Sequence, residues 1–391
     1  MKKIMFTLVL GCFFASFVQA GVVAYWTFDE KDPGTQATLG ETVLDTSGNG
    51  INLEVTARSD PNMTFVEGNP DYNPFGSAVY FFPPSTAQVL IPAAAGPSFD
   101  LGVDYTIESL IWLAGPITTE NGFLAKRGLP GEYWYRFDEP NGRPNFLAGN
   151  YVKDGEVLSS GAKVASDKGI GAEQWTHVAW VRDSVTEEYR VYLDGELVLQ
   201  EHDELAGVSY ENDGSVHPLQ IGAMDPDYDS AAKRFHGKID FIKVSDEALS
   251  VEEFVQPIGK PSDPVPANDS ALVPVDQVFS WSSIEGQNII SETVNLSDTE
   301  DMSNVLESAV ADGNSISFSN LQKGQTYYWR VDTLIDFGED GTSIIEGDVW
   351  SFNTPSCVIT TEEGDLDGNC SVDMLDFSIL AENWLRSNEY E

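Results

Sequence analysis

The sequence predicts a mainly β protein, with two sandwich domains followed by a small helical unit. Short runs of alternating apolar and polar residues, separated by turn residues, fill most of the 391 residues. Two proline-rich joints, at 257–264 and around Thr354-Pro355-Ser356, divide these runs. Near the C-terminal end, an acidic loop precedes apolar residues with helical spacing. We therefore expect domains at 21–256 and 265–355 and a calcium-loop unit at 356–391.

The first twenty residues have the pattern of a secretory signal peptide. Lys2 and Lys3 precede an apolar run, and Val18-Gln19-Ala20 places small residues at a cleavage site. A lipobox around Cys12 is the alternative, but the apolar run continues past it. No later run of about twenty apolar residues indicates a transmembrane anchor. We expect a secreted, extracellular or cell-surface protein.

The charge of the chain narrows the classes of partner. Lys and Arg number 21 against 63 Asp and Glu, a formal net charge of -42. Nucleic acid and anionic membrane surfaces would repel such a protein. Cations are favoured, and Ca²⁺ prefers oxygen ligands. A solvated acidic surface without a specific role is the alternative for most of these carboxylates.

Residues 21–256 have the pattern of a β-sandwich. The run 107–113 is apolar on both faces, as in a covered central strand. Asp194-Gly195 joins two further strands and suits a type I′ turn, because both central residues need positive φ. Helical periodicity is scarce, so two packed sheets are the natural way to bury these strands.

Several motifs of this segment occur in the order found in a known family. They are the opening run 23–30, the turn 45–50, the strand 175–179, the hairpin through 192–195, and the closing run 237–240 with 248–250. Together they resemble laminin-G-like, concanavalin A-like lectin/glucanase domains. The resemblance implies a jelly-roll sandwich that recognises a carbohydrate or a cell-surface ligand, although fold alone does not fix function.

The same resemblance implies a structural calcium ion near the first strand. The candidate ligands are Asp29, Asp45, Asn49 and Asp240. Simple alternation places Asp240 on the face of Ile242 and Val244, where a buried carboxylate needs a partner. Hydrogen bonds from backbone amides are the alternative to a metal ion.

Two features are candidates for ligand binding. In 132–137, Tyr133, Tyr135 and Phe137 share one face, while Trp134 and Arg136 share the other. One face must be core, and the other could offer an aromatic ring to the apolar face of a sugar; burial of both faces is the alternative.

The second feature is a loop with three carboxylates and an aromatic ring, for which a solvated turn is the alternative. It contains Asp225, Asp227, Tyr228 and Asp229.

Residues 265–355 form a second all-β segment. Tyr327 and Trp329 stand in a pattern that resembles the tyrosine corner of fibronectin type III and immunoglobulin-like sandwiches. The resemblance implies a spacer or adhesion domain without chemistry of its own.

The last segment contains an acidic loop with the spacing of an EF-hand calcium site. The expected ligands are Asp365, Asp367, Asn369, Ser371 (through its carbonyl), Asp373 and Asp376. Cys370 occupies the usual glycine position, and a disulfide to Cys357 would hold the turn. After the loop, Phe377, Leu380, Ala381 and Trp384 follow a helical period. The unit resembles one of the two repeats of a type I dockerin, which implies a cohesin-like partner; a metal-free acidic turn is the alternative.

Catalytic motifs are scarce in the sequence. The Glu-x-Asp-x-x-Glu pattern of laminarinase-type glycosidases is missing, as are a serine nucleophile elbow and a phosphate loop. We therefore expect a secreted, modular, non-enzymatic binding protein. The alternatives are a polysaccharide hydrolase or lyase that uses the first domain, and a purely structural adhesion or surface protein.

Overall fold

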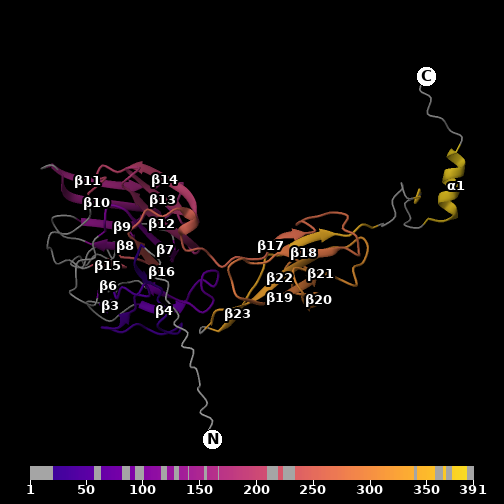
Figure 1. Ribbon diagram of the computed structural model, residues 1–391, viewed down its shortest axis with the longest axis horizontal. Helices are drawn as coiled ribbons and strands as arrows, with labels where there is room; N and C mark the ends of the chain where they lie inside the picture. Colours follow the sequence, from indigo (N-terminus) through magenta and orange to yellow (C-terminus); the bar gives the residue numbers. More distant parts are fainter. Residues whose placement is uncertain are drawn as a thin grey trace, which may run out of the picture. The chain divides into compact units, whose positions relative to one another are not determined.

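A computed structural model describes most of the chain as two compact units, residues 1–256 and 257–391 (Figure 1). The described residues are 21–56, 63–81, 89–92, 101–115, 121–126, 132–139, 141–153, 156–165, 167–208, 219–222, 234–338, 341–356, 364–366 and 372–384. The predicted signal peptide, the acidic loop at 225–229 and the cysteine pair lie outside them. Within these residues, no helix is long and apolar enough to cross a membrane.

The first unit contains two eight-stranded antiparallel sheets. Sheet A runs in the order β14-β13-β12-β7-β16-β5-β4, with β1 also paired to β16. Its strands are β1 (Val22–Trp26), β4 (Met63–Glu67), β5 (Ser77–Phe81), β7 (Tyr105–Leu113), β12 (Trp175–Asp183), β13 (Glu188–Leu193), β14 (Glu196–His202) and β16 (Gly237–Ser245). A short 3₁₀ helix, η2 (Val251–Glu253), follows the last strand.

Sheet B runs in the order β11-β10-β9-β8-β15-β6-β3-β2. Its strands are β2 (Thr42–Val43), β3 (Leu53–Thr56), β6 (Val89–Pro92), β8 (Asn121–Lys126), β9 (Glu132–Asp138), β10 (Arg143–Lys153), β11 (Glu156–Lys163) and β15 (Gln220–Ile221). One apolar cluster takes side chains from both sheets, and the ring of Phe123 in β8 stacks on Trp180 in β12 at 5.5 Å. The two sheets therefore form the predicted sandwich, with its core between them.

The predicted elements of sheet A are present. All residues of β7 except Trp112 are buried, as expected for a covered central strand. Asp194 and Gly195 join β13 to β14 with φ values of 47° and 78°, the two positive angles that a type I′ turn requires.

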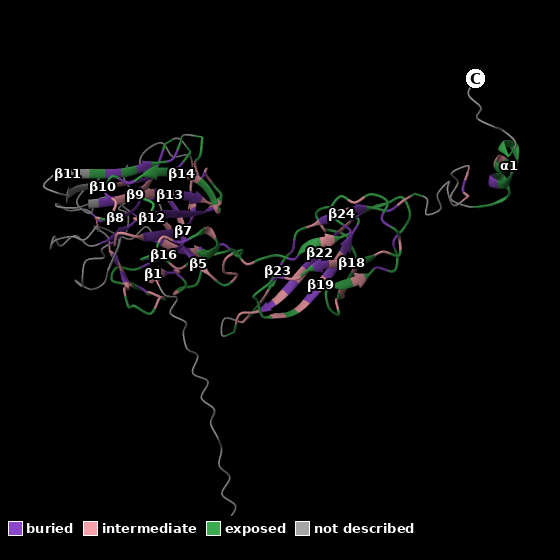
Figure 2. Ribbon diagram, turned by 45° about the horizontal axis from the view of Figure 1, so that its top comes forward, coloured by how far each residue is buried: buried purple, intermediate pink, exposed green. Residues whose placement is uncertain are grey.

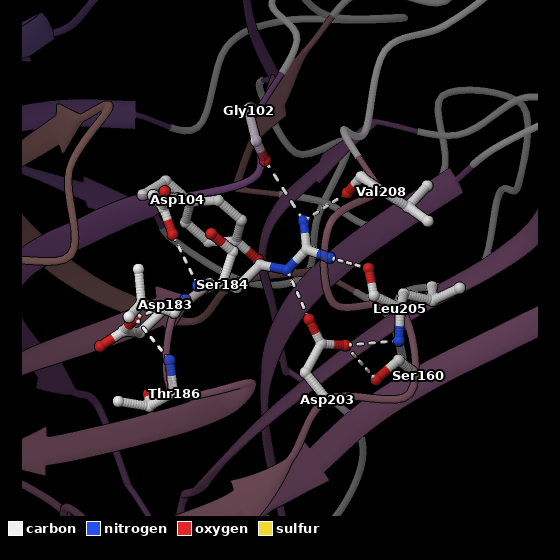
Figure 3. A network of polar contacts seen from close by, with 12 residues as sticks. Gly102, Asp104, Ser160, Asp183, Ser184, Thr186, Asp203, Leu205 and Val208 are labelled. Carbon is white, nitrogen blue, oxygen red and sulfur yellow. Dashed lines mark hydrogen bonds and ion pairs between the residues drawn. The ribbon is translucent and has the colours of Figure 1, made fainter.

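A buried arginine fixes the chain that follows β14. Arg182 on β12 is fully buried, and its Nε lies 2.7 Å from Oδ2 of Asp203. The same guanidinium donates to the carbonyls of Gly102 and Val208. Figure 3 shows the other oxygen of Asp203 accepting from the Ser160 hydroxyl and the Leu205 N–H, at 2.9 Å each. Because Ser160 belongs to sheet B, this network joins the two sheets as well as fixing the turn at 203–208.

The second unit contains a smaller two-sheet sandwich. A three-stranded sheet, β17-β18-β21, faces a sheet ordered β20-β19-β22-β23, with β24 also paired to β22. The strands are β17 (Ser262–Val265), β18 (Val278–Ser282), β19 (Ile289–Ser297), β20 (Val305–Val310), β21 (Ser315–Ser317), β22 (Thr326–Asp336), β23 (Thr342–Ile345) and β24 (Trp350–Asn353). The rings of Phe279 and Trp329 meet between the sheets at 5.2 Å. Strand β17 begins inside the segment predicted as a linker.

Tyr327 occupies the position expected of a corner tyrosine. Its side chain is buried, and its hydroxyl accepts a hydrogen bond from the Gln322 N–H at 2.8 Å. A corner tyrosine bonds in this way to backbone a few residues upstream.

One helix, α1 (Met374–Asn383), is described near the C-terminal end. It begins at Asp373, whose carboxylate accepts from the Leu375 N–H at 2.7 Å, a typical N-cap. Figure 2 shows most of its surface as exposed, and Phe377, Leu380 and Trp384 are exposed side chains. The predicted apolar stripe is therefore present, but in the described part of the chain it does not face a core.

Candidate functional site

Strand β9 separates the predicted aromatic residues into two groups. Tyr133, Tyr135 and Phe137 are buried in the core cluster, and the hydroxyls of Tyr135 and Tyr105 lie 2.7 Å apart. Trp134 is half-buried on the opposite, outer face of sheet B. This placement removes Tyr133 and Tyr135 from the candidate ligand face and leaves Trp134.

A network of charged side chains lies beside Trp134 on the same face. The Asp138 carboxylate lies 2.8 Å from Arg136 Nε and 2.7 Å from Lys163 Nζ, and it accepts a hydrogen bond from the Asn145 side chain at 2.8 Å. Burial alone would raise the pKa of Asp138, but Lys163, Asn145 and Arg136 outweigh it and hold the pKa below its usual value. Two cations thus share the carboxylate of Asp138.

The register of sheet B extends this face across further strands. Leu147, Trp134, Ala125 and Gln220 pair in sequence across β10, β9, β8 and β15. Gln220 is fully buried, and neither polar atom of its amide has a hydrogen-bond partner among the described residues. A buried amide without partners is uncommon and requires an explanation. This amide lies two strands away from Trp134 in the register and is closed to solvent.

Sequence reasoning found Trp134 but missed Asp138, Asn145, Lys163 and Gln220. The alternation within one strand identifies the face of a residue, whereas the pairing register decides which strands stand beside it. Lys163 and Asn145 are direct cross-strand partners across β11 and β10. Their separation along the chain gives no sign of this.

Two side chains predicted as calcium ligands, Asp45 and Asn49, instead hold the turn after the first strand by hydrogen bonds to backbone groups. Asp45 accepts hydrogen bonds from the N–H groups of Tyr25, Ser47 and Ile51, at 2.9–3.0 Å. Asn49 donates to the carbonyls of Val22 and Val23. Burial would raise the pKa of Asp45, but these hydrogen bonds lower it. Both side chains therefore fasten the turn to the backbone of β1 by hydrogen bonds.

Asp240 lies at an irregularity of β16, where the register with β7 shifts between Ile239 and Ile242. Its carboxylate accepts a hydrogen bond from the Asn69 N–H at 2.5 Å. Burial and the nearby charge of Asp29 raise the pKa of Asp240 to about 7 against this hydrogen bond. The sequence predicted that the buried Asp240 carboxylate needs a partner, either a metal ion or backbone amides. The Asn69 N–H is one such backbone partner.

Asp29 is the second member of this acidic pair. It accepts from the Ser77 N–H at 2.8 Å. Two carboxylates and the carbonyls of a turn are donors of the type that Ca²⁺ uses. Among the described residues, however, no group of three His, Cys, Asp or Glu side chains could hold a metal ion.

In the described part of the C-terminal loop, the first and last predicted calcium ligands, Asp365 and Asp376, are both buried. Asp365 and Asp376 are 1% and 2% exposed. Asp376 accepts from the Leu366 N–H at 2.6 Å and from the Asp373 N–H at 2.8 Å. Loop positions 1 and 12 must come together in this way to enclose a cation. Asp367, Asn369 and Ser371 lie outside the described residues, as do Asp225, Asp227, Tyr228 and Asp229.

Comparison with known proteins identifies the first domain. Residues 84–254 match the sequence profile of the concanavalin A-like lectin/glucanases superfamily. This region is therefore a concanavalin A-like domain, as its motifs suggested. A search of curated proteins finds no match to the chain.

Several solved structures share parts of the architecture. Domain 4 of AbnA, a GH43 extracellular arabinanase from Geobacillus stearothermophilus, in complex with arabinotriose, is 16% identical; 60% of this chain and 96% of that chain are covered, with a TM-score of 0.40. The CBM40 of Ruminococcus gnavus IT-sialidase, bound to α2,3-sialyllactose, is also 16% identical, with 46% and 91% covered and a TM-score of 0.32. The binding domain of botulinum neurotoxin serotype G is 9% identical, with 84% and 78% covered and a TM-score of 0.41. Likeness at this level does not determine a ligand.

Proposed function

We propose that the protein is an exported carbohydrate-binding protein whose concanavalin A-like domain takes a glycan on the outer face of sheet B. The observation that supports this most directly is the half-buried Trp134 ring beside the Asp138 network. A flat aromatic ring packs against the apolar face of a sugar, and fixed polar groups beside it hydrogen-bond the hydroxyls. The superfamily match of the same domain is consistent with this chemistry.

The polar groups are held in place before a ligand arrives. Asp138 fixes Arg136 and Lys163, so little side-chain entropy is lost when they meet a sugar hydroxyl.

We propose that this face binds without cleaving its ligand. A glycosidase needs a general acid whose pKa is raised, beside a second carboxylate. The pKa of Asp138 is instead lowered, because hydrogen bonds and the neighbouring cations stabilise its ionised form. This carboxylate is therefore suited to positioning its neighbours and not to proton donation.

An array of plant, algal and animal glycans, probed with the mature chain in calcium-containing buffer, tests the proposal. We expect binding that Trp134→Ala weakens by about tenfold or more, because stacking on the ring is lost. Trp384→Ala is the matched control, since this tryptophan is exposed and directly follows α1 in the other unit. Absence of any bound glycan, or unchanged binding by Trp134→Ala, would contradict the assignment.

The C-terminal unit is proposed to bind Ca²⁺ and to dock a cohesin-like protein. Asp365 and Asp376 would hold the ion at the two ends of the loop, with donors from the intervening positions. Binding would order the loop, since carboxylates repel one another until a cation compensates them. The exposed apolar residues of α1 provide a surface for a protein partner.

In the first domain, Asp29 and Asp240 are proposed as ligands of a second, structural calcium ion.

Calorimetry with the chelated, full-length mature chain tests the calcium proposal. Asp365→Ala should remove one calcium-binding event, and Asp29→Asn with Asp240→Asn should remove the other. The two sets of substitutions lie in different units, so each serves as the control for the other. A titration with the same heat in wild type and Asp365→Ala would refute the C-terminal site.

A further inference from the structure

The outer face of sheet A contains a row of aromatic side chains that the predicted ligand site does not include. Trp175, Trp112, Lys238 and Tyr80 are direct cross-strand partners on β12, β7, β16 and β5. All four are half-buried. Their chain neighbours Ile111, Leu113, Ile239 and Val79 lie in the core, so the row points away from it.

A neighbouring part of this face is covered by the chain itself. His177 lies 3.2 Å from Glu108, and the rings of Tyr72 and Phe254 pack on the histidine. Glu108 also accepts from the Val255 N–H and pairs with Lys243. This polar network fastens the segment after β16 over that part of the sheet. The aromatic row lies beyond this covered region.

Lys238 occupies the centre of the row. Its ammonium lies 4.6 Å from the centroid of the Trp112 ring and 5.7 Å from that of Trp175. Among the described residues it has no carboxylate partner, although acidic residues outnumber basic ones threefold in the chain. The two indole rings hold the cation by its attraction to their faces. Its hydrogen-bond donors are thus available beside flat aromatic surfaces.

From these contacts we infer a second glycan-binding surface, for a linear neutral glycan, along the row Trp175–Trp112–Lys238–Tyr80. Neighbouring strands lie about 4.8 Å apart, so the row spans roughly 14 Å, enough to contact consecutive sugar rings. The indole rings would stack on the sugars, and Lys238 would donate to hydroxyl or ring oxygens. The inference rests on the proposed carbohydrate-binding function and adds a site on the opposite sheet.

The charge of the protein selects a neutral ligand over an acidic one. A net charge of -42 repels a polyanion, and one ammonium group does not reverse that repulsion. The three donors of Lys238 suit the hydroxyl groups of a neutral chain equally well. Neutral glucan, xylan or mannan chains are therefore expected to bind, and polygalacturonate is not.

Binding of cello-, xylo- and mannohexaose to the full mature chain tests this inference, with polygalacturonate as the anionic probe. Trp112→Ala and Trp175→Ala should each weaken binding of at least one neutral hexasaccharide by about tenfold. Lys238→Met keeps the apolar stem on the rings but removes the donors, and should weaken binding severalfold. Thermal melts of each variant establish that the domain is still folded.

Trp134→Ala separates this inference from the proposed function. If Trp134→Ala alone reduces binding and the three row variants bind as wild type, the second surface is refuted while the proposed function stands. If no glycan binds wild type, both are refuted. Light scattering tests whether the row instead contacts a second copy of the chain. If Trp112→Ala abolishes a dimer of the wild type and leaves glycan binding unchanged, the inference is overturned. Preference for polygalacturonate would overturn the choice of a neutral ligand.

Discussion

At the scale of single residues, Asp240 shows how a change of strand pairing alters the direction and surroundings of a side chain. Strand β16 pairs with β5 through Ile239 and with β1 from Ile242 onward. Asp240 lies where the partner changes, so simple alternation fails there. Its carboxylate meets the turn at Asn69, and burial beside Asp29 makes ionisation costly.

This costly ionisation predicts a specific pH dependence of stability. In the folded state the pKa of Asp240 is raised from 3.8 to about 7, so the folded protein binds this proton more tightly than the unfolded chain does. Stability should therefore fall as pH rises from about 4 to about 7, by on the order of 4 kcal/mol. Asp240→Asn cannot ionise and should not show this contribution.

Urea unfolding of the chelated protein at pH 4.5 and pH 7.5 measures the effect. The variant should be the more stable protein at pH 7.5, and the difference should shrink at pH 4.5. Added Ca²⁺ should stabilise the wild type at pH 7.5 if Asp240 is a metal ligand, but should have less effect on the variant. Equal pH dependence in the two proteins would show that this carboxylate is not responsible.

At the scale of elements, local signals identified the hairpin turn and divided the residues of β9 between two faces, but they did not say which face is core. The two positive φ angles at Asp194-Gly195 and the separation of Trp134 from its aromatic neighbours follow from local chemistry alone. For α1, periodicity identified an apolar stripe, but periodicity does not state what covers the stripe. The structure leaves Phe377, Leu380 and Trp384 exposed.

The corner at Tyr327 allows a test within the second unit. Tyr327→Phe removes the hydroxyl that accepts from the Gln322 N–H, so this backbone group loses its partner. We expect the free energy of unfolding to fall by about 1–2 kcal/mol. Tyr328→Phe is the control, because its hydroxyl has no hydrogen-bond partner in the described part of the chain. Equal stability of both variants, measured by denaturant unfolding of the second unit, would show that the corner bond is not stabilising.

At the scale of the whole molecule, acidity is spread over all the predicted domains. Many of the described carboxylates have hydrogen-bond or ion-pair partners, among them Asp45, Asp138 and Asp203. With 63 acidic residues against 21 basic ones, however, most of the negative charge is not balanced by a cation. The excess charge repels itself across the surface and opposes the compact state. This self-repulsion is a property of composition, independent of any one site.

Salt should therefore stabilise this protein. Raising NaCl from about 10 mM to about 1 M shortens the screening length from roughly 30 Å to roughly 3 Å. We expect the Tm to rise by several degrees, while the affinity for neutral glycans changes little. Scanning calorimetry and the hexasaccharide titrations at both salt concentrations measure these effects. A Tm that falls with salt would show that attractive ion pairs outweigh the net repulsion.

The sequence by itself determined the mainly β class and the hairpin at Asp194-Gly195, and it divided the aromatic residues of 132–137 between two faces of one strand. These features depend on residues that are neighbours along the chain, whose alternation and φ preferences are local. Only the tertiary structure decided which strands lie together. It placed Lys163 and Asn145 beside Asp138, set Gln220 two strands from Trp134, and aligned Trp175, Trp112 and Lys238 in one row. Pairing register joins residues that are distant in the chain, and a shift of one residue would turn each side chain to the other face.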